Sequence, residues 1–169
     1  MKIRKATVTD AEGVAKVQVD SWYSTYKDIV PEEYLRKMTY ESREKKWKDI
    51  ISKQPVFIAE DNKGKIIGFS NGGPERTGKY PEFEGELYAI YILKDHQRKG
   101  LGKQLLKPII QELEDQGIYS MLVLVLEDNH SRFFYEKVGA EKLDIIEIEV
   151  SRKRLSEVVY GWKDIRKIK

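Results

Sequence analysis

The residues from Gln97 to Lys103, Gln-Arg-Lys-Gly-Leu-Gly-Lys, combine two glycines with three cationic side chains. The stretch lies between an apolar, strand-like run and a segment with leucine and isoleucine at helical spacing. A strand that leads into a helix through two glycines leaves the first N–H groups of the helix without acceptors, and such groups favour a phosphate. Arg98, Lys99 and Lys103 add full charges around the same point. The stretch therefore predicts a site for a phosphate-bearing anion.

The two glycines, Gly100 and Gly102, are predicted to matter because a Cβ atom at either position would hold a ligand away from the backbone. A Walker-type loop requires Gly-x-x-x-x-Gly-Lys-Ser/Thr, and the chain has no such spacing. A dinucleotide fingerprint requires a third glycine where this chain has Leu105, and it should open the first βαβ unit. The pattern that remains is Gln-x-x-Gly-x-Gly, for which a capped helix with exposed lysines is the alternative interpretation.

Length and composition limit the class of protein. At 169 residues the chain has the length of one domain, so we expect a single domain over residues 1–169. The 31 Lys and Arg residues against 28 Asp and Glu give a net charge of +3, which is too small to predict general nucleic-acid binding. The absence of cysteine excludes disulfides and thiol nucleophiles. With no signal peptide or long apolar span in the sequence, we expect a cytoplasmic protein without a membrane partner.

The elements that must position the anion site follow from periodicity and turn signals. We expect strands at 1–6, 56–60, 65–69, 87–93, 121–126, 143–150 and 155–162, and helices at 32–38, 41–52, 100–116 and shortly before Gly139. Thr9 and Glu12 have the spacing of a capping box, which predicts the start of the first helix. The hairpin formed by 56–60 and 65–69 is expected to close at Gly72-Gly73-Pro74.

Three aromatic residues, Trp22, Tyr23 and Tyr26, gather near the end of the first helix and before Pro31. Aromatic side chains at such a place can belong to the core or form the wall of a pocket, and both interpretations stay open. In a pocket they would suit a cationic amine through cation–π contacts. The nearby carboxylates that would add negative charge are Glu75, Glu82 and Glu84. The two histidines, His96 and His130, have no partner at metal-ligand spacing, so no metal site is predicted.

Several segments, taken in order along the chain, resemble a common bacterial branch of the GNAT family of N-acetyltransferases. They are Ala6–Asp10, the Trp22 and Tyr26 pair, 31–35, 72–74, 85–92, the Gln-x-x-Gly-x-Gly pattern, 134–139 and 155–160. The resemblance implies an α/β (α+β) fold with a mixed, mostly antiparallel central sheet of about seven strands flanked by helices. It also implies acetyl-CoA as the cofactor and direct attack of a primary amine on the acetyl thioester.

The resemblance implies a place for each part of acetyl-CoA. The pyrophosphate would lie on Gln97, Arg98, Lys99, Gly100, Leu101, Gly102 and Lys103. The pantetheine arm would enter between the strands 88–93 and 121–126 and pair with main-chain groups of Ile90, Tyr91 and Ile92. The family places an Asn seven residues before its tyrosine, whereas Asn129 is six before Tyr135 and Asp128 is seven before it. Asn129 is the candidate contact to CoA, with Asp128 as the alternative.

Glu86 is the candidate catalytic base. It is expected on the same strand face as Tyr88, Ile90 and Ile92, where partial loss of water would raise the pKa of its carboxylate. A water chain or another carboxylate such as Glu84 is the alternative.

Tyr135 is the candidate acid, because it matches the family tyrosine that donates a proton or hydrogen bond to the departing sulfur. Packing beside Phe133 and Phe134 is the alternative role. A backbone N–H near Ile92 would stabilise the oxyanion.

These predictions favour an acetyl-CoA-dependent N-acetyltransferase that acts on the primary amine of a small molecule, such as a polyamine or an aminoglycoside, with Trp22 and Tyr26 binding the amine. The alternatives are a non-catalytic GNAT-like sensor of CoA, a protein N-terminal or lysine acetyltransferase, and a small basic module that binds nucleic acid. The last is disfavoured because no aromatic residues interleave the basic segment. We expect a monomer or a homodimer.

Overall fold

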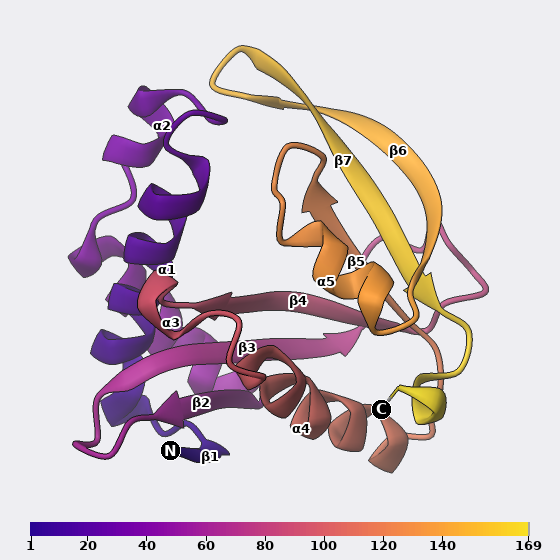
Figure 1. The fold of residues 1–169 in the computed structure, drawn as a ribbon, viewed down its shortest axis with the longest axis horizontal. Coiled ribbons are helices and arrows are strands. Elements are labelled where there is room, and N and C mark those ends of the chain that lie inside the picture. Colours follow the sequence, from indigo (N-terminus) through magenta and orange to yellow (C-terminus); the bar gives the residue numbers. More distant parts are fainter. Residues whose placement is uncertain (169) are drawn as a thin grey trace.

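The computed structural model describes residues 1–168, which fold around one sheet of seven strands (Figure 1). The strands are β1 (Lys2–Lys5), β2 (Val56–Glu60), β3 (Ile66–Pro74), β4 (Gly85–Ile92), β5 (Met121–Leu126), β6 (Glu141–Val150) and β7 (Lys153–Trp162). Their order in the sheet is β1-β2-β3-β4-β5-β7-β6, and only the β4–β5 pair is parallel. The prediction of a mixed, mostly antiparallel sheet of about seven strands is confirmed.

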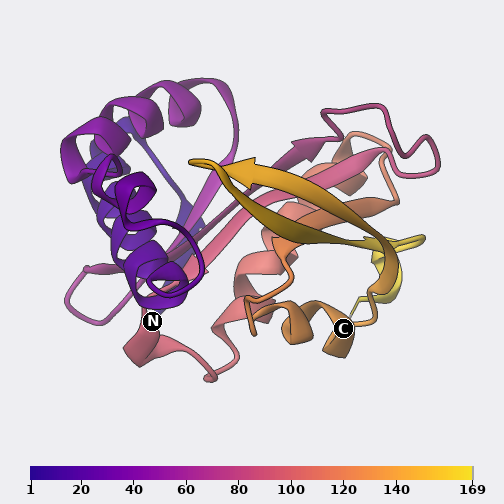
Figure 2. The same ribbon diagram turned by 90° about the horizontal axis from the view of Figure 1, so that it is seen from above.

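Helices cover both faces of the sheet. On one face, α1 (Ala11–Tyr26) and α3 (Tyr40–Lys53) pack on β2 and β3, and the short α2 (Glu32–Arg36) follows α1. On the other face, α4 (Leu101–Asp115) and α5 (Arg132–Lys137) pack on the centre of the sheet and on β5 and β7. Figure 2 shows α1 to α3 gathered at one end of the molecule, with the tip of the β6–β7 hairpin reaching toward them. This contact includes a hydrogen bond of 2.8 Å from Lys153 Nζ to the carbonyl of Ile29.

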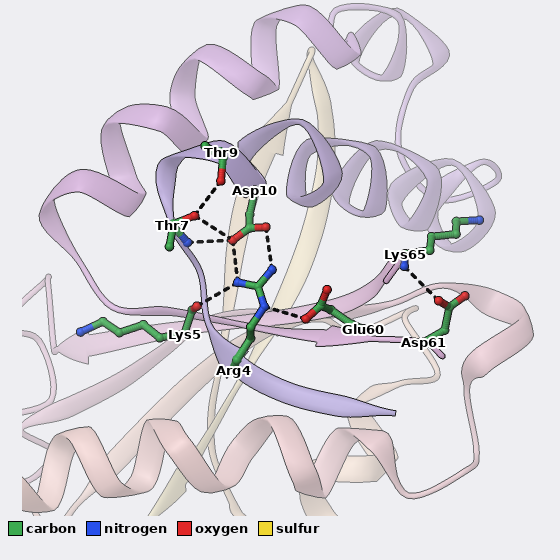
Figure 3. Close-up of polar contacts among 8 residues, drawn as sticks. All are labelled: Arg4, Lys5, Thr7, Thr9, Asp10, Glu60, Asp61 and Lys65. Atoms are coloured by element: carbon green, nitrogen blue, oxygen red, sulfur yellow. Dashed lines mark hydrogen bonds and ion pairs between the residues drawn. The ribbon is translucent and has the colours of Figure 1, made fainter. Parts of the chain in front are cut away.

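A polar cluster ties the N-terminal strand to the start of α1 (Figure 3). The Arg4 guanidinium donates to both carboxylate oxygens of Asp10 at 2.8 and 2.9 Å and to Glu60 on β2 at 2.6 Å. Asp10 also accepts from the backbone N–H of Thr7, which caps the 3-10 turn Val8–Asp10 ahead of α1. The predicted capping box of Thr9 and Glu12 is therefore wrong. The box is formed two residues earlier, because Arg4 holds the Asp10 carboxylate where it can reach the Thr7 N–H.

β3 continues well beyond the predicted hairpin. Gly72, Gly73 and Pro74 do not close a turn, since they pair with Leu87, Glu86 and Gly85 of β4. Glycine has no side chain and proline has a short one, so the sequence at these positions lacks the alternation of a strand. The backbone nevertheless finds partners in β4, and the connection between the two strands is the loop 75–84.

Two irregularities in β4 shape the centre of the sheet. β4 and β5 pair only at Gly85 with Met121 and at Glu86 with Leu122, so the two strands separate beyond their first residues. β4 also carries a bulge, because Asn71 of β3 faces Ala89 whereas Gly72 faces Leu87, which leaves Tyr88 as an extra residue. Separation and bulge occur in the same stretch of β4 and create an opening in the sheet.

Candidate active site

A cleft of about 420 Å³ lies where β4 and β5 separate. Its walls come from α1, α2, the loop 75–84, β4, β5, β6 and β7. Five of the lining residues are aromatic, namely Trp22, Tyr26, Tyr34, Tyr88 and Tyr91. The charged lining residues are Arg76, Glu86 and Glu157. The cleft therefore combines an aromatic wall with two carboxylates and one guanidinium.

The aromatic wall is centred on Trp22. Its ring centroid lies 4.4 Å from that of Tyr26, 5.8 Å from that of Tyr34 and 6.5 Å from that of Tyr91. Tyr26 is buried and belongs to a small apolar cluster with Leu126 and Leu155. The two interpretations of the aromatic residues are thus compatible, because Tyr26 is both a core residue and a lining residue of the cleft.

Asn129 lies in the loop between β5 and α5, and its side chain is buried. Its amide Nδ2 donates to the Tyr26 hydroxyl at 2.9 Å, and its Oδ1 accepts from the backbone N–H of Ser131 at 2.9 Å. Both ends of this amide therefore have partners within the protein. The side chain fixes the position of Tyr26 relative to the β5–α5 loop, while its predicted contact with CoA stays a prediction.

Glu86 is buried as predicted, with its side chain 4% exposed, but it is not alone. Arg76 donates to its carboxylate from Nη2 at 2.6 Å, from Nε at 3.3 Å and from the backbone N–H at 3.2 Å. The Arg76 guanidinium also lies 4.0 Å from the ring centroid of Tyr88. Arg76 is not among the predicted site residues, because the loop 75–84 has no periodicity that could place it against the strand.

Glu157 on β7 is a second lining residue that is not among the predicted site residues. The residue is half-buried, and no donor or cation among residues 1–168 pairs with its carboxylate. Burial raises the pKa of Glu157, and the negative charge of Glu86 raises it further. The resemblance had marked the segment 155–160, but only as part of the last strand.

The bulge at Tyr88 overturns the predicted arrangement of side chains along β4. Glu86 and Tyr88 line the cleft, whereas Ile90 and Ile92 pack on the opposite face against Leu101 and its neighbours in α4. An extra residue in one strand reverses the alternation of the side chains that follow it. Glu86 therefore does not share a face with Ile90 and Ile92.

Tyr135 lies on α5 and is buried against Phe134, Tyr160 and Trp162. It does not line the cleft. It shares an apolar cluster with Leu87 and Val125, and these two residues do line the cleft. Burial, and then the nearby Tyr91 hydroxyl, raise the pKa of Tyr135, so its hydroxyl keeps its proton at neutral pH.

The predicted anion site has the expected backbone. None of the N–H groups from Arg98 to Lys103 donates to another group within residues 1–168. Arg98 and Gly100 have left-handed backbone angles, with φ of 60° and 81°, and alternation of hand turns successive N–H groups toward one concave point. The Arg98, Lys99 and Lys103 side chains are exposed, and no ion pair is found for them among the described residues. These residues fit the pyrophosphate of acetyl-CoA.

Glycine is required at the two positions of the anion site for different physical reasons. A Cβ on Gly100 would meet nothing within 4 Å, so its requirement comes from its positive φ. A Cβ on Gly102 would lie 3.0 Å from the Phe134 ring. The predicted reason for Gly102 is thus incomplete, because this glycine also lets α5 approach the first turn of α4.

The edge of β4 beyond the β5 pairing is partly open. Leu93 N–H donates to Ile67 of β3, and the alternation of an antiparallel ladder then directs Tyr91 toward β3 and Ile90 and Ile92 away from it. Main-chain groups of Ile90 and Ile92 therefore face the gap to β5, as an added strand requires, whereas those of Tyr91 do not. The carbonyl of Ile92 accepts from Gln97 Nε2 at 2.9 Å, which links β4 to the anion site.

The other predicted residues lie outside the cleft. Glu75 uses its carboxylate within its own loop, on the N–H groups of Thr77 and Gly78, while Glu82 and Glu84 are exposed. Within residues 1–168 there is no group of three or more His, Cys, Asp or Glu that could hold a metal ion. No helix in this part of the chain is long and apolar enough to cross a membrane.

The chain is similar in sequence to known proteins. The family model of the acetyltransferase (GNAT) family matches residues 19–140. The chain is 41% identical to the uncharacterized N-acetyltransferase YuaI of Bacillus subtilis over 167 residues, covering 99% of this chain and 95% of YuaI. It is 26% identical to an L-methionine sulfoximine/L-methionine sulfone acetyltransferase of Pseudomonas aeruginosa, covering 81% of each chain. It is 29% identical to a spermidine N(1)-acetyltransferase of Thermoplasma acidophilum, covering 82% of this chain and 87% of that one.

A solved structure supports the fold. The putative acetyltransferase yncA of Salmonella typhimurium, determined with its cofactor acetyl-CoA, superposes with a TM-score of 0.71 at 18% identity, covering 96% of this chain and 92% of yncA. The family match spans well over half of the chain and includes the anion site and most of the cleft. The chain therefore belongs to the GNAT family and is an N-acetyltransferase, as the sequence predicted.

Proposed function

We propose that this enzyme transfers the acetyl group of acetyl-CoA to the primary amine of a small molecule bound in the cleft. The observation that carries the proposal is the cleft in which the aromatic wall and two carboxylates adjoin the open edge of β4. A protonated amine is attracted both by the faces of aromatic rings and by carboxylates. A volume of about 420 Å³ matches a small ligand.

In this proposal the residues from Gln97 to Lys103 hold the pyrophosphate, and the main-chain groups of Ile90 and Ile92 hold the pantetheine arm. When bound, acetyl-CoA supplies a thioester whose carbonyl carbon the neutral amine attacks. The chain must then orient the amine, take its proton, stabilise the oxyanion through a backbone N–H near Ile92 and supply a proton to the sulfur. Tyr135 is the proposed donor to the sulfur, because its hydroxyl has no hydrogen-bond partner among residues 1–168 and holds its proton at neutral pH.

The acceptor is proposed to be a small cation such as a polyamine or an aminoglycoside. The chain's similarity to a spermidine acetyltransferase agrees with this class. An α-amino acid is a second candidate, because Arg76 places a guanidinium at the cleft with its side chain 59% exposed. Its Nε and Nη2 bind Glu86, which leaves Nη1 for a carboxylate. The similarity to an acetyltransferase of L-methionine sulfoximine and sulfone agrees with this second class.

A thiol-release assay with acetyl-CoA distinguishes the classes. We expect release with at least one small amine among spermidine, an aminoglycoside and L-methionine sulfone. If L-methionine sulfone is active and its carboxamide is not, Arg76 recognises a carboxylate. Activity confined to peptide N-termini or lysine side chains would make the enzyme a protein acetyltransferase, and binding of acetyl-CoA without any release would indicate a sensor.

The role of the aromatic wall is tested by Trp22→Ala. Loss of a cation–π contact worth about 1–2 kcal/mol should raise the KM for the amine roughly tenfold and leave acetyl-CoA affinity unchanged. Tyr23→Ala is the matched control, because Tyr23 is the next residue of α1 but does not line the cleft. Normal kinetics combined with a lower melting temperature in Trp22→Ala would show that Trp22 only stabilises the fold.

A further inference from the structure

We infer that Glu157 on β7, and not Glu86 on β4, is the group that removes a proton from the ammonium of the acceptor. The inference rests on the proposed function, because it assigns a step of acetyl transfer in the same cleft. It starts from the two carboxylates that line this cleft, which have opposite surroundings.

Glu86 is already paired with a cation. Three donors of Arg76, including its backbone N–H, are within 3.3 Å of the Glu86 carboxylate oxygens. These donors occupy both carboxylate oxygens, Nη2 on one and Nε with the backbone N–H on the other, so an ammonium reaches Glu86 only by displacing Arg76. Glu86 is therefore suited to hold Arg76 in place, which makes it a positioning residue.

Glu157 has the properties that Glu86 lacks. No donor or cation within residues 1–168 pairs with its carboxylate, and the carboxylate lies in a half-buried wall of the cleft. β7 pairs Glu157 with Leu126 of β5 and Ile146 of β6, so its neighbours in the sheet are apolar. An unpaired carboxylate in apolar surroundings is the one that gains most from a proton or from a cationic ligand.

The charged and titratable groups around Glu157 lie on α1, on β4 and on the loop 75–84. Glu86 lies on β4 and Arg76 on the loop 75–84, while Tyr26 of α1, Tyr80 of the same loop and Tyr91 of β4 are within electrostatic range. The three tyrosines stay neutral near pH 7, since their pKa values are raised. The Glu86 charge favours the protonated form of Glu157, which narrows the difference in pKa between this carboxyl and an amine.

Acetyl transfer takes two protons from the nitrogen and gives one to the sulfur. The N–H bond of the ammonium breaks, its electron pair stays on nitrogen, and the proton goes to the Glu157 carboxylate. The nitrogen pair forms the C–N bond to the acetyl carbon, and the C–S bond breaks with its pair on sulfur. As the amide forms, the nitrogen loses its second proton. The Tyr135 hydroxyl gives its proton to the sulfur, and the second proton of the nitrogen, carried by water, restores that hydroxyl. The proton on Glu157 passes to water, so each turnover of an ammonium releases one proton in total.

The first test is the dependence of kcat/KM on pH for Glu157→Gln and Glu86→Gln, with an amine that the wild-type enzyme acetylates. We expect Glu157→Gln to lose about 10²-fold near pH 7, where the amine is protonated, and much less near pH 10, where it loses its proton unaided. The loss in Glu86→Gln should be the same at every pH, because this variant releases Arg76 and does not remove the base. Glu147→Gln is the control, since Glu147 is exposed on the neighbouring strand and faces the other side of the sheet. The inference is overturned if Glu86→Gln shows the pH-dependent loss and Glu157→Gln does not.

The second test needs no turnover. In the free enzyme labelled with ¹³C at the glutamate carboxyl carbons, one carboxyl should titrate above the usual range of glutamate, and its signal should be missing in Glu157→Gln. If no carboxyl titrates high, or if the high signal persists in Glu157→Gln, the inference fails even in an active enzyme. If no amine class is acetylated, the proposed function fails, whatever this titration shows.

Discussion

At the scale of single residues, the cleft contains two carboxylates with different surroundings. Arg76 pairs with Glu86, whereas Glu157 remains without a partner among residues 1–168. These different partners suit the two carboxylates to different roles, Glu86 to positioning Arg76 and Glu157 to accepting a proton. Tyr135 completes this division, since burial keeps its hydroxyl protonated on the far side of the opening between β4 and β5.

Removal of the Tyr135 hydroxyl should affect catalysis and not binding. Tyr135→Phe removes a positioned proton donor, so kcat should fall by about 10²-fold, with little recovery at high pH. Calorimetry should show acetyl-CoA affinity close to that of the wild type. Tyr119→Phe is a suitable control, because Tyr119 is exposed and lies outside the cleft. A wild-type kcat in Tyr135→Phe would mean that the thiolate takes its proton from water.

At the scale of elements, the start of α4 combines two left-handed residues with six consecutive N–H groups that have no acceptor within residues 1–168. Its position is fixed from three sides, by Leu101 in the core, by the Phe134 ring against Gly102 and by the bond from Gln97 to the carbonyl of Ile92. Binding of a phosphate therefore requires no large rearrangement of this turn.

The two ends of α4 provide a matched pair of glycine substitutions. Gly100 and Gly117 have similar positive φ values of 81° and 75°, and a Cβ at either would meet nothing within 4 Å. Alanine at each position should lower the free energy of unfolding by about 1–2 kcal/mol, the cost of a left-handed backbone. Only Gly100→Ala should weaken acetyl-CoA binding, by roughly tenfold. In this variant the backbone relieves its strain by rotating the N–H groups at the start of α4 away from the anion, whereas the strain in Gly117→Ala lies at the other end of the helix. Equal affinities in calorimetry on the two variants would show that the turn is not the anion site.

At the scale of the whole molecule, an N-terminal part with β1 to β4 and a C-terminal part with β5 to β7 are joined by two connections. β4 and β5 share two paired positions, and the hairpin tip of β6 and β7 closes the other side on the α1–α2 loop through Lys153 and Ile29. The cleft lies between these two connections. The N-terminal part is itself held by the cluster of Arg4, Asp10 and Glu60, which joins β1, β2 and the start of α1 (Figure 3).

The Asp10 carboxylate should contribute to stability in a pH-dependent way. Hydrogen bonds from Arg4 are the main cause that lowers the pKa of Asp10, so the folded state holds this carboxylate charged to lower pH than the unfolded chain does. Its contribution is therefore complete above about pH 4 and is lost as the pH falls through the folded pKa. Asp10→Asn should lower the free energy of unfolding by about 1–3 kcal/mol at pH 7, and the difference from wild type should shrink below pH 4. Urea unfolding at pH 7 and at a pH below 4 tests this, with exposed Asp49→Asn as the control.

The sequence by itself determined the features that depend on neighbours in the chain. The positions of most strands and helices follow from periodicity, and the left-handed Gly100 and the free N–H groups at the start of α4 follow from one short run of residues. For the aromatic residues at the end of α1 the sequence left core and pocket open, and in the structure Trp22 and Tyr26 line the cleft because a helix brings them onto one side.

Tertiary structure alone decided which distant groups meet in the cleft. The extra residue at Tyr88 is visible only in the register of β4 against β3, and it reverses the faces of Ile90 and Ile92. The pairing of Arg76 with Glu86 depends on how a loop without periodicity folds back on its strand. The exposure of Glu157 to the cleft depends on β7 lying beside β5 in the sheet. Such contacts depend on the packing of distant segments, and the local pattern of residue types does not determine this packing.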